Sequence, residues 1–371
     1  MDNPVQQARH LGQSMWLDNV ARGLLTSGEM RRLIALGISG ATSNPTIFEK
    51  AIDGSTDYDE ALKELALGGA STVGIYEALT QADIRATADL LRPLYEETNG
   101  QDGYVSLEVN PGLAYDTEGT VAEAQRLFRA LDRPNVMIKV PATTEGIPAI
   151  RRLIGSGVNV NVTLIFSLEV YREVCQAYIE GLHHLSAGGG EVARIASVAS
   201  FFVSRVDTAV DRLLQERIGQ GGADLQGLLG RAAVANAKLA YQRFKTIFGG
   251  ERFASLLAQG PRVQRPLWAS TSTKNPAYSD VMYVEPLIGP HTVNTLPPVT
   301  LQAFLDHGRV AASIEQGIGE AEELMEGLRA ASIDMEQVTS DLLTEGVKLF
   351  ADSFDKLLRG IEEKKARLPR R

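Results

Sequence analysis

The sequence predicts an eight-stranded parallel (β/α) barrel with additional helices toward its C-terminus. Short strand-like runs alternate along the chain with longer segments whose apolar residues recur every three or four positions. The chain has 371 residues, which leaves room for insertions around a barrel of ~250 residues. An open doubly wound sheet is the alternative, but the sequence has no glycine-rich nucleotide fingerprint of the GxGxxG or GxxxxGK[ST] type.

The alternating elements can be followed in order. The expected strands are residues 14–18, 37–43, 104–109, 136–140, 159–166, 193–200, 266–271 and 280–286. The clearest helical patterns cover residues 26–36, 72–99, 117–131, 167–185 and 203–218. The stretch 300–371 is helical in pattern, and we expect it to pack on the barrel as part of a single domain spanning residues 1–371.

The composition narrows the range of possible functions. The net charge of −9 argues against broad attraction to nucleic acid or to an anionic membrane. Cys175 is the one cysteine, so neither an internal disulfide nor a cysteine metal cluster is expected. The first residues lack the apolar segment of a signal peptide, and no apolar run approaches membrane-spanning length. We therefore expect a cytoplasmic protein.

Three of the predicted strands carry an unusual polar face. Side chains alternate along a strand, so Lys139 lies opposite Val136, Ile138 and Val140. In the same way, Glu108 lies opposite Val105 and Leu107, and Asn161 and Thr163 lie opposite Val160, Val162 and Leu164. If the apolar faces contact the helix layer, then the polar faces point into the barrel, where burial is costly unless these groups are paired.

Polar residues also gather near the C-terminal ends of the predicted strands, where barrel enzymes place their active sites. The sequence predicts that one pocket collects Asp18, Asn44, Glu108, Lys139, Asn161, Thr163, Ser200 and Ser270. A lysine enclosed by strands loses solvation, which lowers the pKa of its amine from an ordinary ~10.4. The neutral amine attacks carbonyls and forms a Schiff base, while nearby carboxyls move protons. The expected chemistry is that of an aldolase without metal or cofactor.

Several motifs resemble the signature blocks of the transaldolase family. They are GISGATSNPTIF, VSLEV followed by AYD, NVMIKVPATTEGI, NVNVTLIFS, ASFFVSRVD and LWASTSTKNP, in that order. The resemblance implies transfer of a dihydroxyacetone unit from sedoheptulose 7-phosphate to glyceraldehyde 3-phosphate, giving erythrose 4-phosphate and fructose 6-phosphate. Its implied partners are small sugar phosphates, with no nucleic acid and no membrane; monomer and homodimer both remain open.

The resemblance also implies roles by motif position. Lys139 matches the imine-forming lysine, Asp18 the acid/base of carbon–carbon cleavage, and Glu108 with Thr163 the pair that handles a catalytic water. The positions that match substrate-binding residues are Asn44, Asn161, Ser200, Arg205 and Ser270. Many family members carry an arginine two residues after the serine that matches Ser270. Here that position is Ser272, and the nearest cation is Lys274, which we expect to help bind phosphate.

Two other functions remain possible at this stage. A fructose-6-phosphate aldolase would use a related mechanism as a lyase, although such relatives are shorter and lack the extended C-terminal helices. A catalytically silent barrel that binds sugar phosphates is the second alternative, and the complete set of Asp18, Glu108 and Lys139 argues against it.

Overall fold

A computed structural model describes residues 2–221 and 223–367, and its centre is a closed barrel of eight parallel strands in sequential order. Strand β1 pairs with both β2 and β8, which closes the barrel. The strands are β1 Gln13–Leu17, β2 Gly40–Thr42, β3 Tyr104–Glu108, β4 Val136–Pro141, β5 Val160–Ile165, β6 Ser197–Phe202, β7 Arg265–Ala269 and β8 Thr292–Leu296. The predicted barrel is confirmed.

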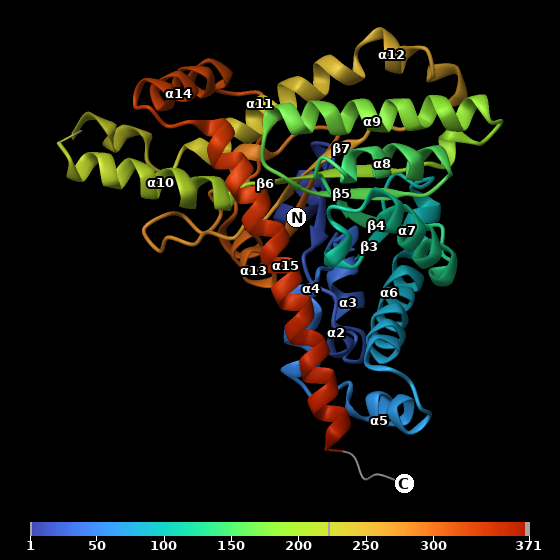
Figure 1. The fold of residues 1–371 in the computed structure, drawn as a ribbon. Coiled ribbons are helices and arrows are strands. Elements are labelled where there is room, and N and C mark those ends of the chain that lie inside the picture. Colours follow the sequence, from blue (N-terminus) through green and yellow to red (C-terminus); the bar gives the residue numbers. More distant parts are fainter. Residues whose placement is uncertain (1, 222, 368–371) are drawn as a thin grey trace.

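Helices surround the barrel (Figure 1). Their bounds are α1 Pro4–His10, α2 Arg22–Thr26, α3 Glu29–Ala35, α4 Pro45–Asp53, α5 Asp59–Leu67, α6 Thr72–Glu97, α7 Thr117–Leu131, α8 Gly146–Gly155, α9 Leu168–Ala187, α10 Ser204–Gly219, α11 Ala232–Phe248, α12 Glu251–Ala254, α13 Pro298–His307, α14 Ile318–Ala330 and α15 Met335–Ala366. Five 3₁₀ turns are also present in the described residues: η1 Pro111–Leu113, η2 Val192–Arg194, η3 Ala223–Leu228, η4 Leu257–Gln259 and η5 Glu285–Leu287.

The prediction of the eighth strand was wrong. Residues 280–286 form turns that lead into η5, and the strand is instead β8, Thr292–Leu296. The segment TVNTL carries three polar residues in five, so it does not look like a buried strand. Inside the barrel these polar groups are paired: Asn294 Nδ2 donates to the Tyr283 carbonyl at 3.3 Å, and the hydroxyls of Thr295 and Thr42 lie 2.7 Å apart. The sixth strand is displaced as well, because residues 192–194 form η2 and β6 begins at Ser197.

A second correction concerns Leu164. The alternation along 158–164 predicts that Leu164 shares a face with Val160 and Val162. The pairing of β5 with β6 instead shifts register between Val162 and Ile165, and Leu164 has a φ of +59°. Such a bulge redirects a side chain at the cost of backbone strain. The Leu164 side chain consequently contacts α15 at Gly346.

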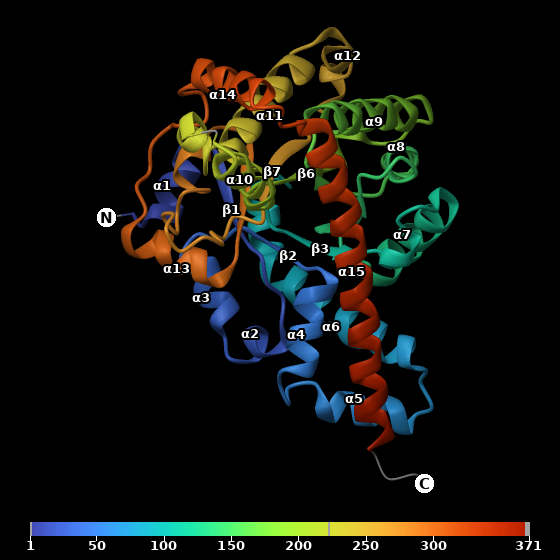
Figure 2. The same ribbon diagram turned by 60° about the vertical axis from the view of Figure 1, so that its left-hand side comes forward.

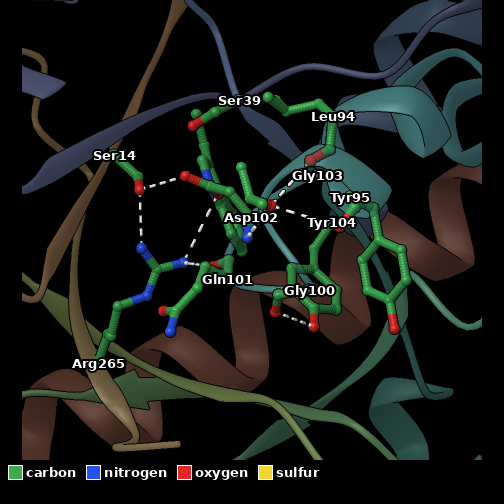
Figure 3. Close-up of polar contacts among 12 residues, drawn as sticks. Ser14, Ser39, Leu94, Tyr95, Gly100, Gln101, Asp102, Gly103, Tyr104 and Arg265 are labelled. Carbon is green, nitrogen blue, oxygen red and sulfur yellow. Dashed lines mark hydrogen bonds and ion pairs between the residues drawn. The ribbon is translucent and has the colours of Figure 1, made fainter. Parts of the chain in front are cut away.

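The N-terminal end of the barrel is held by a buried polar network around Asp102 (Figure 3). The Asp102 carboxylate accepts hydrogen bonds from Ser14 Oγ and from Trp16 Nε1, the latter at 2.7 Å. Arg265 Nη2 lies 3.6 Å from Asp102 Oδ1, and its Nη1 donates to Ser14 Oγ at 2.7 Å. The network therefore ties the starts of β1 and β7 to the loop before β3.

Helix α15 crosses the opposite, C-terminal end of the barrel (Figures 1 and 2). Its hydroxyl Ser353 Oγ lies 2.8 Å from Thr46 Oγ1 of α4, and Lys356 Nζ lies 2.5 Å from Glu49 Oε1. Near its end, Lys364 Nζ donates to the Ile52 carbonyl at 2.8 Å. The segment after residue 300 is helical as predicted, and this long helix covers the barrel mouth.

Candidate active site

Lys139 lies on β4 inside the barrel and is only 4% exposed. Its Nζ donates to the Ser43 carbonyl oxygen at 3.2 Å and lies 3.5 Å from Glu108 Oε2. The strand register explains this proximity, because Glu108 is directly paired with Lys139 across β3 and β4. A buried amine and a buried carboxyl group therefore face each other within the mouth.

Asp18 follows β1 and completes a triad with these two residues. Thr42 Oγ1 donates to Asp18 Oδ1 at 2.7 Å, which fixes the carboxyl group. Burial raises the pKa of Asp18, and the nearby Lys139 opposes that shift. Asp18 is also close enough to Glu108 to affect its titration. Glu108 lies on β3, Lys139 on β4, and Asp18 directly after β1, and the three side chains lie close together.

Glu108 and Thr163 share an unusual property. Among the described residues, Glu108 Oε2 and Thr163 Oγ1 are buried and make no hydrogen bond. Buried polar atoms normally have partners, so an unpaired one indicates a place for water or ligand. Burial raises the pKa of Glu108 to about 7, against the opposing effect of Lys139. A carboxyl group with this pKa can both give and take protons near neutral pH.

The predicted amide and hydroxyl residues lie around this triad. Asn161 Nδ2 donates to Ser106 Oγ at 3.0 Å, and Ser200 Oγ donates to Asn161 Oδ1 at 2.7 Å. Asn44 caps α4, since its Oδ1 accepts a hydrogen bond from the Ile47 backbone at 2.9 Å. This bond fixes the Asn44 side chain and leaves its Nδ2 as a possible donor to a ligand.

The predicted phosphate residues lie at the outer part of the mouth. Arg205 is in the first turn of α10, and its guanidinium carbon lies 5.5 Å from the Phe202 ring centre. Ser270 follows β7 with a φ of +55°, and its hydroxyl lies 3.1 Å from Ser204 Oγ. Lys274 Nζ donates to Ser272 Oγ at 2.6 Å, so the nearest cation contacts the residue at the position of the family arginine.

Sequence reasoning missed one cation in this region. Partial burial lowers the pKa of Lys274, and repulsion from Arg205 and from Lys50 lowers it further. Lys50, in the last turn of α4, is therefore close to Lys274. It lies six residues after Asn44 within the motif SNPTIFEK, so its place on the helix after β2 was the available signal.

Sequence reasoning also missed the contribution of α15. The Phe350 ring centre lies 5.7 Å from Lys139 Nζ. Glu345 is close enough to Arg205 to raise its pKa, although burial lowers the pKa of that guanidinium overall. A Cβ on Gly346 would lie 2.9 Å from Leu164 Cδ2 and 3.7 Å from Arg205 Nη1, so glycine permits the close approach of α15. Helical periodicity alone does not say where such a helix docks.

The described residues offer no group of three or more histidine, cysteine, aspartate or glutamate side chains arranged to hold a metal ion. The same part of the chain has no helix long and apolar enough to cross a membrane. A closed barrel with a buried lysine beside two buried carboxyl groups is typical of aldolases that work through a Schiff base.

Comparisons with known proteins identify the family. Residues 15–361 match the family model described as Transaldolase/Fructose-6-phosphate aldolase. A transaldolase of Trichodesmium erythraeum is 48% identical, over 99% of this chain and 98% of that protein. A transaldolase of Saccharopolyspora erythraea is 50% identical over 95% of both chains, and one of Thiobacillus denitrificans is 48% identical over 97% and 99%. The chain belongs to the transaldolase/fructose-6-phosphate aldolase family.

Proposed function

We propose that this protein is a transaldolase that moves a dihydroxyacetone unit from sedoheptulose 7-phosphate to glyceraldehyde 3-phosphate. The products are erythrose 4-phosphate and fructose 6-phosphate. The observation that carries the proposal is the buried pair of Lys139 Nζ and Glu108 Oε2, 3.5 Å apart. The names of relatives at 48–50% identity support the same activity.

In the first half of the reaction, the neutral Lys139 amine adds to the C2 carbonyl of the donor and water leaves, which forms an iminium ion. Glu108 donates the proton that converts the departing hydroxyl group into water, and Thr163 helps to hold that water. Asp18 then removes the proton of the C4 hydroxyl group. The C3–C4 bond breaks, its electrons pass into the iminium ion, and erythrose 4-phosphate leaves with the enamine still on Lys139.

In the second half, the enamine attacks the aldehyde carbon of glyceraldehyde 3-phosphate and forms a new C3–C4 bond. Asp18 returns its proton to the resulting oxygen. Water activated by Glu108 adds to the iminium carbon, the C–N bond breaks, and fructose 6-phosphate leaves. Asn44, Asn161 and Ser200 are proposed to bind the hydroxyl groups of the three-carbon unit. This unit stays bound to the enzyme through both halves of the reaction.

Arg205, Ser270 and Lys274 are proposed to bind the phosphate of the donor and of the acceptor. The arginine fork can hold two phosphate oxygens, whereas a lysine acts as a point charge. Lys50 is proposed as a further cation near the same phosphate, because it lies close to Lys274. Three cations at this place would attract a dianionic phosphate group, although the protein as a whole is acidic.

We further propose that residues 1–371 act as one domain, since α15 contacts helices from the first half of the barrel. A cytoplasmic location is proposed on the basis of the sugar phosphate substrates and the single cysteine, Cys175, which is buried and free. The proposed partners are small sugar phosphates, without nucleic acid or membrane, and the chain acts as a monomer or homodimer.

The proposal is tested by borohydride reduction in the presence of fructose 6-phosphate, followed by peptide mass mapping. The expected result is a three-carbon adduct on the peptide that contains Lys139, which Lys139→Ala abolishes. Asp18→Ala should still form the initial adduct but slow the cleavage step. A protein that binds sugar phosphates without catalysis would give no adduct, and this result would reject the proposal.

Product analysis separates the transferase from the lyase alternative. With fructose 6-phosphate as donor and erythrose 4-phosphate as acceptor, a transferase forms sedoheptulose 7-phosphate. Without an acceptor it should release little free dihydroxyacetone, because water must then hydrolyse the enamine-bearing enzyme. Rapid release of dihydroxyacetone that does not depend on the acceptor would instead favour the lyase.

A further inference from the structure

A small cavity lies on the helix side of Glu108, between β3, α6, α7 and α15. Its volume is about 30 Å³, and the residues that line it include Tyr76, Gln81, Glu108, Asn110 and Phe354. A cavity of this size has room for a water molecule, and water occupies such places when it has two to four polar partners. Tyr76, Gln81, Glu108 and Asn110 provide those partners.

Glu108 connects the cavity to the site of imine chemistry. Its side chain is 5% exposed, and it is the same carboxyl group whose Oε2 lies 3.5 Å from Lys139 Nζ. Among the described residues, that oxygen has no hydrogen-bond partner although it is buried. A water molecule in the cavity would lie beside this carboxyl group, which its ion pair connects to the Lys139 amine.

One side of the cavity is lined by residues of α6 and α7. Val73 contributes to the lining and is 47% exposed. Glu77 and Glu123 also line it, and Arg126 Nη2 bridges them at 2.5 and 3.1 Å. Nearby, Tyr76 and Phe354 pack edge to face with ring centres 5.1 Å apart. The lining thus runs from a solvent-exposed residue of α6 to Glu108, with a charged cluster and an aromatic pair beside it.

A bound substrate would hinder water exchange through the main mouth during turnover. Phe350 lies over Lys139 from α15, and a bound sugar would occupy space beside the amine. Forming the imine nevertheless releases one water molecule, and hydrolysing it consumes one. A water that had to pass the bound sugar would delay both steps.

We propose that the cavity beside Glu108 is a water site that exchanges with solvent between α6 and α7, and that it supplies and removes the water of imine chemistry. This inference rests on the proposed function. Val73 lies at its entrance, and Gln81 acts as a positioning residue for the water. Neither side chain is part of the set that contacts the sugar.

The test measures exchange of the C2 oxygen of fructose 6-phosphate in ¹⁸O-labelled water without an acceptor. Each cycle of imine formation and hydrolysis releases the original oxygen as water and replaces it with a solvent oxygen. Val73→Trp should close the entrance and slow this exchange by about tenfold, which corresponds to about 1.4 kcal/mol in the barrier. Leu257→Trp, at a site that is 59% exposed and outside the cavity lining, is the matched control and should exchange at the parental rate.

A second measurement isolates the step that needs no water. The enzyme is loaded with the three-carbon unit, freed of sugar phosphates, and mixed with erythrose 4-phosphate in a rapid-quench instrument. Bond formation should proceed at the parental rate in Val73→Trp and in Gln81→Leu, while ¹⁸O exchange is slow in both. Gln81→Leu tests the same site without adding bulk at the surface.

Parental exchange rates in both variants would show that water enters through the main mouth and would overturn the inference. An equal loss of exchange and bond formation would also overturn it, because that result indicates general damage to the site. Failure of the proposed function gives a different result: the unsubstituted protein would then form no borohydride-trapped adduct at Lys139 at all.

Discussion

The ring of Phe350 on α15 lies over the amine of Lys139 on β4, with 5.7 Å between the ring centre and Nζ. The contact joins the last helix of the chain to the fourth strand of the barrel. It places an apolar ring on one side of the lysine amine, and Phe350 itself is only 4% exposed. Water is therefore excluded from that side of the lysine.

The Phe350 contact predicts how often the enamine is transferred to an acceptor and how often it is hydrolysed. Phe350→Leu keeps an apolar side chain and should cost only about 1 kcal/mol of stability. It should raise the release of free dihydroxyacetone relative to transfer by about two- to tenfold, because water gains access to the imine. The ratio of dihydroxyacetone to sedoheptulose 7-phosphate measures this. Leu349→Ala, on an exposed face of the same helix, should leave the ratio unchanged.

Glu108 predicts a pH dependence of both stability and activity. Burial raises the pKa of Glu108 to about 7, above the ~4.3 of an unfolded glutamate. The folded state binds the proton more tightly, so the stabilisation from this group is complete below the unfolded pKa and is lost as the pH rises from about 4 to 7. Glu108→Gln should flatten that part of the curve of unfolding free energy against pH, measured by urea titration.

The same substitution should lower the rate of imine formation by about 10²–10⁴-fold, the usual value of a general acid or base. The borohydride trapping rate plotted against pH should also lose its inflection near the Glu108 pKa. An inflection that persists unchanged in Glu108→Gln would assign the titration to another group, with Asp18 the nearest candidate because burial raises its pKa as well.

The close approach of α15 at Gly346 predicts a steric effect on the phosphate end of the site. A Cβ there would lie 2.9 Å from Leu164 and near Arg205, so Gly346→Val should displace the helix. We expect a KM for sugar phosphates that is raised by about tenfold or more, corresponding to a loss of about 1.4 kcal/mol in binding. Gly319→Val is the control, since a side chain at that helical glycine meets no atom within 4 Å.

The cations at the mouth predict a graded loss of phosphate binding. Lys274→Ala and Lys50→Ala should each raise the KM by about three- to tenfold, and Lys274→Arg should recover part of the loss, because both residues act mainly through charge. The effects should shrink as the salt concentration rises. Lys348→Ala removes a lysine that is 75% exposed on α15 and should have no such effect. A KM that is insensitive to Lys50→Ala would remove this residue from the phosphate site.

The network at the other end of the barrel predicts a loss of stability without a change in chemistry. Asp102→Ala leaves Arg265 and Trp16 without their shared partner, and breaking a buried ion pair of this kind costs about 3–5 kcal/mol. The KM of the remaining folded enzyme should stay at its parental value. Asp89→Ala breaks the exposed pair with Arg133 and should cost no more than about 1 kcal/mol in the same urea titration.

The outcome for the sequence predictions follows from where each residue lies. The alternation along β3, β4 and β5 was sufficient to bring Glu108, Lys139 and Asn161 to one face, because parallel register places them side by side. The strand β8 was missed because its polar residues are paired only in the folded barrel, for example Thr295 with the distant Thr42. Leu164 was misplaced because a bulge breaks the alternation on which the prediction depended.

The remaining site contacts could not be predicted from the sequence, because they depend on how segments far apart in the chain dock. The helical pattern of residues 335–366 is plain in the sequence, yet nothing in it specifies that Phe350 meets Lys139 or that Glu345 approaches Arg205. Lys50 was overlooked for a related reason: its charge matters only once α4 and the loop of Lys274 are brought together. Such contacts depend on how packed elements meet, which local periodicity does not encode.

Helix α15 follows all eight strands in the chain, and it therefore leaves the ribosome after them. A nascent chain could close its barrel and assemble Lys139, Glu108 and Asp18 before Phe350 is available to cover them. Until synthesis reaches this helix, the reactive amine would stand open to any aldehyde or ketone in the surroundings. Synthesis and docking of α15 thus also shield the lysine from unwanted carbonyl compounds.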